Sequence, residues 1–254
     1  MKISLFFIII SLMSFMVNAQ VDWRIVNVTT GEWAPYTSQN LPHGGLANHI
    51  VSEAFSAVGI KTNFGFFPWR RSYLYVKNGQ DDKKKEWHAS TLWLYSDERA
   101  KELIYSLPVV ATESVVFHLK SNPIDLSDEP SKQKLNIGVN ELAPTPLLDK
   151  LEKDGVIRIE RVADDDVSLN RLLYRSLDGV LITKNVGLYY LSKLSKEEQN
   201  KITYSNTPVR SVPMYLVISK KIKNAEELVR QFNNGIRKIE QNGRLDQIIR
   251  EYTF

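Results

Sequence analysis

The residues from Trp87 to Ser106, WHASTLWLYSDERAKELIYS, place aromatic side chains, a helix start and an arginine within a few positions. An apolar run of strand length is followed by Ser96, whose hydroxyl can cap a helix, and then by two acidic residues where the helix dipole favours negative charge. The positive charge of Arg99 in this first turn is unfavourable by roughly 0.3–1 kcal/mol. Either an anionic ligand at the helix start compensates Arg99, or Arg99 forms an ordinary surface ion pair with Glu98 or Glu102.

Residues typical of catalytic or metal sites are scarce in this chain. The chain has no cysteine, and its four histidines have no metal-binding spacing; they are His43, His49, His88 and His118. The sequence contains no nucleophile elbow, no phosphate-binding loop with lysine and no dinucleotide fingerprint. We therefore predict a protein that is not an enzyme and that needs no cofactor and no metal.

The first residues predict export. Lys2 precedes an apolar run from Ile3 to Val17, and small residues up to Ala19 provide a cleavage site before Gln20. The run is shorter than the roughly 20 residues that a membrane span needs. We predict that residues 1–19 are a cleaved signal peptide and that the mature chain is in an exported compartment; an uncleaved anchor is the alternative.

Composition indicates an ordinary globular protein. Of the 254 residues, 43% are hydrophobic and 24% are charged, and the net charge is +4. Lysines and arginines alternate with acids, and the run from Asp81 to Glu86 balances three lysines with three acids. This pattern argues against a nucleic-acid partner.

Strand and helix patterns alternate in two stretches, which predicts an α/β fold with ligands at the strand ends. A polar, proline-bearing stretch from Ser121 to Pro130 separates the two, and Thr145 with Pro146 predicts a capped helix start in the second. Asn224 and Glu227 predict a capping box for a long amphipathic tail helix. The strand predicted at 214–219 has no local partner. The predicted strands cover 23–29, 61–67, 87–95, 106–120, 135–139, 156–162, 177–182 and 214–219, and the main helices 46–58, 69–77, 145–154, 165–176, 185–194 and the tail.

Several short motifs, in this order and spacing, carry a resemblance. They are Gly31–Tyr36, Phe67–Arg71, Asp97–Arg99 with Tyr105–Pro108, and Phe232–Ile236 with Asn242–Leu245. Over its whole mature length the chain resembles a family 3 extracytoplasmic solute-binding protein of the amino-acid ABC transporter type, in a proline-tryptophan-basic-arginine variant.

The resemblance implies a type II periplasmic binding protein fold, in which two α/β lobes close over a ligand by hinge motion. Lobe 1 would comprise residues 20–112 and 209–254, and lobe 2 residues 113–208, with crossings near 111–116 and 206–212. The implied function is capture of a small polar solute by a monomer that delivers it to an ABC transporter permease. Two rivals are an enzyme on the same scaffold, such as a dehydratase with a cleft carboxylate, and a sensory binder without a transport role.

The resemblance also implies site residues. Arg99 would grip a ligand carboxylate, Trp33 would stack on the ligand, and Trp69 and Arg71 would line the cleft wall. Structural roles compete with these assignments, because both tryptophans could be core anchors and Arg71 could pair with Glu53 or Asp97.

The chain also departs from the family pattern. Leu92 and Leu94 stand where a hydroxyl pair is usual, and Thr183 followed by Lys184 stands where an aspartate commonly holds the ligand's ammonium group. An amino acid is the default ligand, with Glu32 or Glu141 as substitute ammonium partners, and a carboxylate without an amine is the alternative. Thr145 would cap a helix whose start also faces the ligand.

Overall fold

The computed structural model describes residues 23–124, 126, 134–141 and 145–252. The predicted signal peptide lies outside this range. None of the helices in the described part of the chain combines the length and apolarity that crossing a membrane would require.

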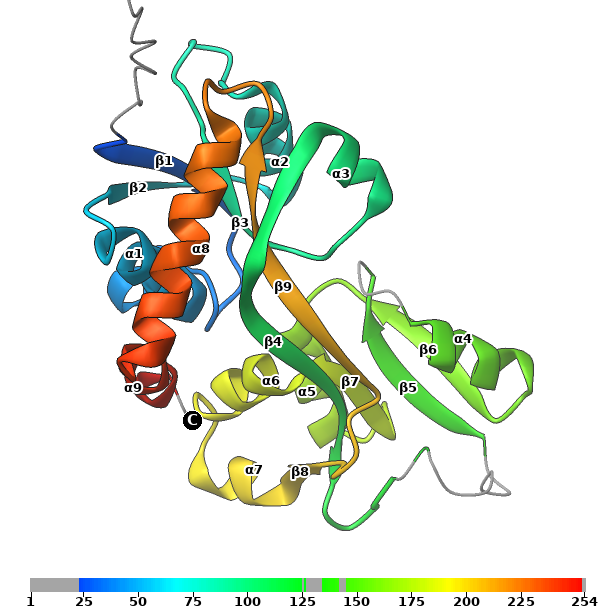
Figure 1. Cartoon of the computed structure of the whole chain (residues 1–254). Coiled ribbons are helices and arrows are strands. Elements are labelled where there is room, and N and C mark those ends of the chain that lie inside the picture. Colours follow the sequence, from blue (N-terminus) through cyan, green and yellow to red (C-terminus); the bar gives the residue numbers. More distant parts are fainter. Residues whose placement is uncertain (1–22, 125, 127–133, 142–144, 253–254) are drawn as a thin grey trace, which may run out of the picture.

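Strands and helices alternate along most of the chain, as the sequence predicts (Figure 1). The elements are β1 (Ile25–Thr30), η1 (Pro42–Gly44), α1 (Leu46–Ser56), β2 (Lys61–Phe66), α2 (Trp69–Asn78), β3 (Ala89–Trp93), α3 (Asp97–Glu102), β4 (Leu103–Leu119), β5 (Leu135–Asn140), α4 (Pro146–Lys153), β6 (Ile157–Val162), α5 (Asp165–Leu173), β7 (Gly179–Thr183), α6 (Lys184–Leu191), α7 (Lys196–Lys201), β8 (Ile202–Tyr204), β9 (Arg210–Ser219), α8 (Ala225–Gln241) and α9 (Arg244–Glu251).

The strands form one sheet in the order β2-β1-β3-β9-β4-β7-β5-β6, with β8 paired to β4. β1 is parallel to β2 and β3, and β5 is parallel to β6 and β7. β4 and β9 are antiparallel to each other, and they join the two parallel units. The sheet therefore has two α/β units with a shared antiparallel pair between them.

The long strand β4 runs from the first unit into the second (Figure 1). Its pairing with β9 extends from Leu103 opposite Ser219 to Ser114 opposite Arg210, with two register shifts. The segments predicted as crossings meet in this ladder, where Thr112 pairs with Val212. The strand predicted at 214–219 finds its partners in β3 and β4, which are distant in sequence.

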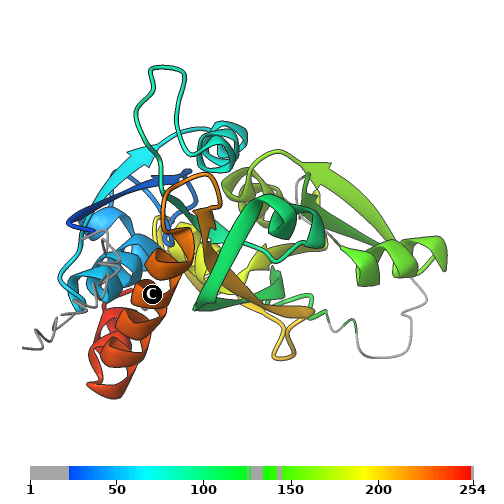
Figure 2. The ribbon, with the colours of Figure 1, turned by 45° about the horizontal axis from the view of Figure 1, so that its top comes forward.

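Helices cover both faces of the sheet. α1 and α8 pack with α5 and α6 around one large apolar core, whereas α4 covers a smaller core on β5, β6 and β7. α2 packs over a third cluster that contains Val76, Leu103 and Val217. In both views α8 and α9 lie beside α1, so the end of the chain completes the first unit (Figures 1 and 2).

The tail helix α8 confirms its predicted buried stripe, whose members are Leu228, Val229, Phe232, Ile236 and Ile239. Phe232 contacts Phe55 of α1, with ring centroids 4.9 Å apart. Gly235 makes this approach possible, because a Cβ there would lie 1.9 Å from the carbonyl oxygen of Ala54. The helix period and one glycine thus fix how α8 sits on α1.

Helix caps follow the sequence less closely. Ser195 forms a capping box with Glu198, as the local sequence Ser195-Lys196-Glu197-Glu198 predicts. The capping box predicted at Asn224 is wrong, because Asn224 has a left-handed backbone and makes no side-chain cap. Glu227, its predicted partner, accepts a hydrogen bond from the Gln231 amide instead, at 2.9 Å.

Candidate functional site

A cavity of about 340 Å³ lies where α2, the end of β3 and α3 meet. Its lining combines aromatic rings with three charged groups; the residues are Trp69, Arg70, Tyr73, Trp93, Ser96, Glu98 and Arg99. The volume is at the small end of the range for ligand pockets. The structure therefore brings the two predicted site residues Arg99 and Trp69 into one cavity.

Arg99 has no ion-pair partner among the described residues, so the surface ion pair that the sequence left open does not form. Glu102 pairs instead with Lys77, at 3.2 Å. The Arg99 guanidinium lies over the ring of Trp93, with its carbon 5.2 Å from the ring centroid, and donates one hydrogen bond to the Leu94 carbonyl at 3.1 Å. Its remaining donors can reach a planar anion, which suits a carboxylate.

Trp69 is held from two sides. Its indole nitrogen donates to the carbonyl of Glu32 at 3.3 Å, and its ring meets the edge of Trp93 with centroids 5.7 Å apart. Gly31 makes room for the indole, because a Cβ at this position would lie 2.4 Å from the Trp69 ring. The motif beginning at Gly31 thus shapes the aromatic wall through its backbone.

The end of β3 carries a bulge that positions Trp93. The ladder to β9 shifts register between Ser90 and Trp93, and Leu92 between them has a φ of 64°. A left-handed conformation at a bulky residue costs about 1–2 kcal/mol. The Trp93 indole donates to the Ser90 hydroxyl at 2.8 Å, which fixes the ring under Arg99.

Leu92 and Leu94, which replace the hydroxyl pair of the family pattern, serve the site in a different way. Leu92 is buried in the large core. The backbone carbonyl of Leu94 accepts hydrogen bonds from Arg99 and from the hydroxyl of Tyr105, the latter at 3.0 Å. Burial raises the pKa of Tyr105, while the neighbouring Arg99 opposes this rise.

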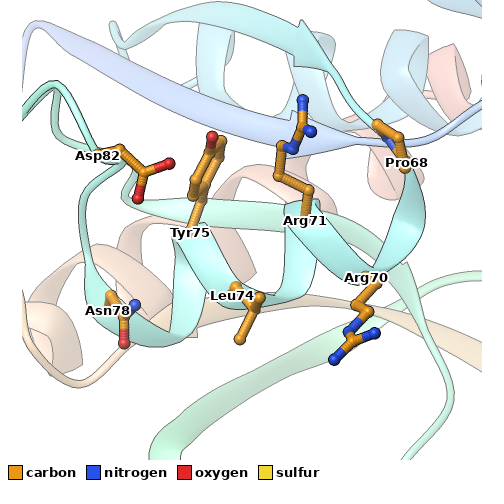
Figure 3. A pocket seen from close by; sticks show the side chains of 7 residues that line it. All are labelled: Pro68, Arg70, Arg71, Leu74, Tyr75, Asn78 and Asp82. Carbon is orange, nitrogen blue, oxygen red and sulfur yellow. The ribbon is translucent and has the colours of Figure 1, made fainter.

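The structure separates Arg71 from Arg99. Arg71 lies in a second hollow on the outer side of α2, which is lined by Pro68, Arg70, Arg71, Leu74, Tyr75, Asn78 and Asp82. Figure 3 shows Arg70 and Arg71 pointing to different sides of the helix. Arg71 forms no ion pair in the described part of the chain, so the pairs with Glu53 and Asp97 that the sequence left open are not seen.

Trp33 and Glu32 also lie outside the Arg99 cavity. Trp33 is half-buried, packs against the large core and stacks on Tyr36 with centroids 4.9 Å apart. The exposed carboxylate of Glu32 accepts a hydrogen bond from the backbone of Gln39 at 3.1 Å. Both side chains therefore contact the loop after β1, and the stacking of Trp33 on a ligand stays a prediction.

Four expected capping or cleft positions have other surroundings. Thr145 is buried at the start of α4, but it does not cap the helix. Its hydroxyl donates to Asp149 at 3.0 Å and accepts from Arg161 at 3.1 Å, so the ion pair between Asp149 and Arg161 takes the place of the cap. Ser96 precedes α3 without a side-chain cap and lines the cavity instead. Thr183 is half-buried at the end of β7, opposite Ser114. Glu141 is exposed.

Asp165 is a potential site residue that the sequence patterns predict only as the first residue of a helix. It begins α5 beyond the end of β6, and its carboxylate lies 3.5 Å from the Asn140 amide at the end of β5. Burial raises the pKa of Asp165 to about 6, and the neighbouring Asp166 and Asp164 add to this rise. Ligands of open α/β sheets bind beyond these strand ends.

No group of three or more metal-ligating side chains occurs among the residues that the structure describes. His43 and His49, separate in sequence, stack with ring centroids 3.9 Å apart, and His49 contacts Arg244 and Tyr252 of the tail. These contacts tie α9 to α1. They belong to the packing of the first unit and lie outside the Arg99 cavity.

The sheet topology, with two parallel α/β units joined by an antiparallel strand pair, defines the class of fold. The chain belongs to the bacterial extracellular solute-binding proteins, family 3, which residues 25–254 match. A search among curated proteins finds no match.

Solved structures with the type II periplasmic binding protein fold are similar over most of their length. The open form of substrate-binding domain 2 of Lactococcus lactis GlnP is 16% identical, with a TM-score of 0.66 over 92% of this chain and 97% of that one. A histidine kinase sensor domain with similarity to periplasmic binding proteins is 14% identical, with a TM-score of 0.64 over 91% and 96%. The ancestral amino acid-binding protein AncCDT-1, a precursor of cyclohexadienyl dehydratase, is 15% identical, with a TM-score of 0.62 over 90% and 94%. These likenesses establish the fold, and the chain is a member of that fold class.

Proposed function

We propose that the protein captures a small carboxylate-bearing solute, by default an amino acid, in the periplasm and delivers it to an ABC transporter permease. Residues 1–19 would be its cleaved signal peptide, and two lobes, 20–112 with 209–254 and 113–208, would close over the ligand. The protein would act as a monomer without catalysis. Membership of the family and the presence of a transporter domain among the similar structures support this role.

One observation carries the proposal: the guanidinium of Arg99 lies on an aromatic ring beside a cavity and has no described counter-ion. Desolvating a cation without an anion is unfavourable unless a ligand supplies the anion. A hydrogen bond to a charged group contributes about 1.5–3 kcal/mol. The carboxylate of a bound solute would therefore gain most of its affinity here.

The raised pKa of Asp165 supports a location for the ligand's amine. Asp165 lies beyond the end of β6 in the second unit. Family members often place an acid beyond β7 instead, where this chain has Thr183. An ammonium group beside Asp165 would remove the cost of its buried negative charge. Asp165 is thus a stronger candidate than the exposed Glu32 or Glu141.

The same carboxyl favours one rival function. A carboxyl group with a pKa near neutrality in a closed cleft can act as a general acid, and an ancestral binding protein on the path to a dehydratase has this fold. Turnover of a bound compound, followed by mass spectrometry, would establish the enzyme. A sensory role would be recognised by capture of a receptor ectodomain rather than a permease.

Thermal-shift screening of the mature protein against amino acids and small carboxylates tests the proposal. A ligand at 100 times its dissociation constant stabilises the folded protein by about 2.7 kcal/mol. We expect at least one carboxylate to raise the melting temperature, and Arg99→Gln to reduce its affinity by roughly 10- to 150-fold, which corresponds to one lost charge-assisted contact.

The matched control is Arg250→Gln, which removes an exposed arginine of α9, at the far end of the first unit (Figure 1). It should leave affinity unchanged. Equal affinity of the Arg99 variant and the wild type, with both folded by circular dichroism, would contradict the role of Arg99.

A further inference from the structure

The charges in the Arg99 cavity outnumber what one carboxylate needs. Two cations, Arg70 and Arg99, and one anion, Glu98, line the same cavity. None of the three forms an ion pair with another described residue. The cavity therefore presents two separate positive charges and one negative charge to whatever enters it.

Arg70 has no evident structural reason for its position. It is exposed in the first turn of α2, a turn without acidic residues, so its charge is unfavourable beside the positive end of the helix dipole. It has no described hydrogen bond or ion pair. Its neighbour Arg71 turns to the other side of the helix, while Arg70 lies on the rim that the outer hollow shares with the Arg99 cavity (Figure 3).

The two indole nitrogens of the cavity wall are already used. The Trp69 indole donates to the Glu32 carbonyl, and the Trp93 indole donates to the Ser90 hydroxyl. The groups left to recognise a ligand in this half of the site are the three charged side chains and the hydroxyls of Tyr73 and Ser96. The charged side chains are the stronger of these, because hydrogen bonds to charged groups contribute more than neutral ones.

We infer that the ligand is a small dicarboxylate, with one carboxylate held by Arg99 and the second held by Arg70. This inference rests on the proposed solute-binding function and names its substrate class. The cavity's two positive charges and one negative charge complement two carboxylates and one ammonium group. For an acidic amino acid, Glu98 would take the amine in place of Asp165, because Glu98 lines the same cavity as both arginines. A dicarboxylate without an amine would leave Glu98 in solvent.

Isothermal titration with matched ligands tests the second carboxylate. L-Glutamate, L-aspartate, glutarate and succinate are compared with L-glutamine and L-asparagine, in which a neutral amide replaces one carboxylate. The dicarboxylates should bind at least about tenfold more tightly than the amides, because each lost charge-assisted contact is worth about that factor or more. Comparing L-glutamate with glutarate shows whether the amine contributes.

Substitution then assigns the preference to Arg70. Arg70→Gln should bring the dicarboxylates to within about threefold of the amides while leaving the affinity for the amides unchanged, since the amides do not use Arg70. Arg250→Gln should preserve the preference. Because Arg70 is exposed, the preference should also weaken as salt is raised.

The outcomes separate this inference from the proposed function. Arg99-dependent binding of an amide or a monocarboxylate that is as tight as binding of every dicarboxylate would overturn the inference alone. An Arg70 variant with an unchanged dicarboxylate preference would do the same. Absence of binding by every ligand in the series and by every compound of the wider screen would overturn both.

Discussion

Replacing Gly31 with alanine should deform the Arg99 cavity although Gly31 itself does not line it, because the added methyl group would displace Trp69, which does. A Cβ at Gly31 would lie 2.4 Å from Cε2 and 2.5 Å from Cδ2 of Trp69, whereas carbon atoms normally approach to about 3.5–4.0 Å. The backbone of Gly31 lies outside the left-handed region, so alanine can adopt it. The clash with the indole is therefore the main effect of the substitution.

The expected cost combines two contributions. Forcing a methyl group into a packed site typically costs about 1–3 kcal/mol, and moving the indole weakens its hydrogen bond to Glu32, worth about 0.5–1.5 kcal/mol. The free energy of unfolding should fall by about 1.5–4.5 kcal/mol. For a chain of this size each kcal/mol lowers the melting temperature by roughly 2–4 °C.

A double-mutant cycle with Trp69→Ala isolates the clash. Urea denaturation of the wild type, Gly31→Ala, Trp69→Ala and the double variant gives the four free energies of unfolding. Gly31→Ala should cost little when Trp69 is already absent. If it costs the same in both backgrounds, the close approach of Gly31 to the indole is not what keeps this position small.

Two further predictions concern pH. Burial raises the pKa of Asp165 from 3.8 to about 6, so the folded state holds this proton more tightly than the unfolded state, and stability is lost as pH rises between those values. Asp165→Asn should therefore raise the free energy of unfolding at neutral pH but not below pH 3.8. Urea denaturation at both pH values measures this, and an equal gain at the two pH values would contradict it. Burial, with a contribution from His43, lowers the pKa of His49 below 6.5, so its contribution to stability is intact above pH 6.5 and falls as the solution becomes more acidic. His49→Gln should reduce that loss in chemical denaturation, with the remainder due to His88, whose pKa burial also lowers; an unchanged pH dependence would show that His49 is not responsible.

The elements of this fold could be predicted from sequence periodicity. The stripe on α8 is buried as predicted, and the capping box at Ser195 forms because both of its hydrogen bonds are local. Arg99 and Trp69 could be assigned to one wall because the family motifs carry them. Local patterns succeed where the interacting groups are within a few residues of each other.

Tertiary contacts decided which residues line the cavity. Arg70 and Arg71 are adjacent in sequence and share the outer hollow, yet only Arg70 also lines the Arg99 cavity, because the sheet beneath α2 determines which side of the helix meets Trp93 and Arg99. The hydroxyl of Thr145 does not form its predicted cap and instead accepts a hydrogen bond from Arg161, a strand residue sixteen positions away.

The sequence by itself thus determined where helices and strands form, and that the strand at 214–219 has no partner nearby in the sequence. Tertiary structure alone decided which charges share a cavity and which are neutralised elsewhere. Glu102, for example, is neutralised by Lys77. The physical reason is that helix and strand periods record which face of an element is apolar, whereas pairing of charges depends on distances between elements that packing sets.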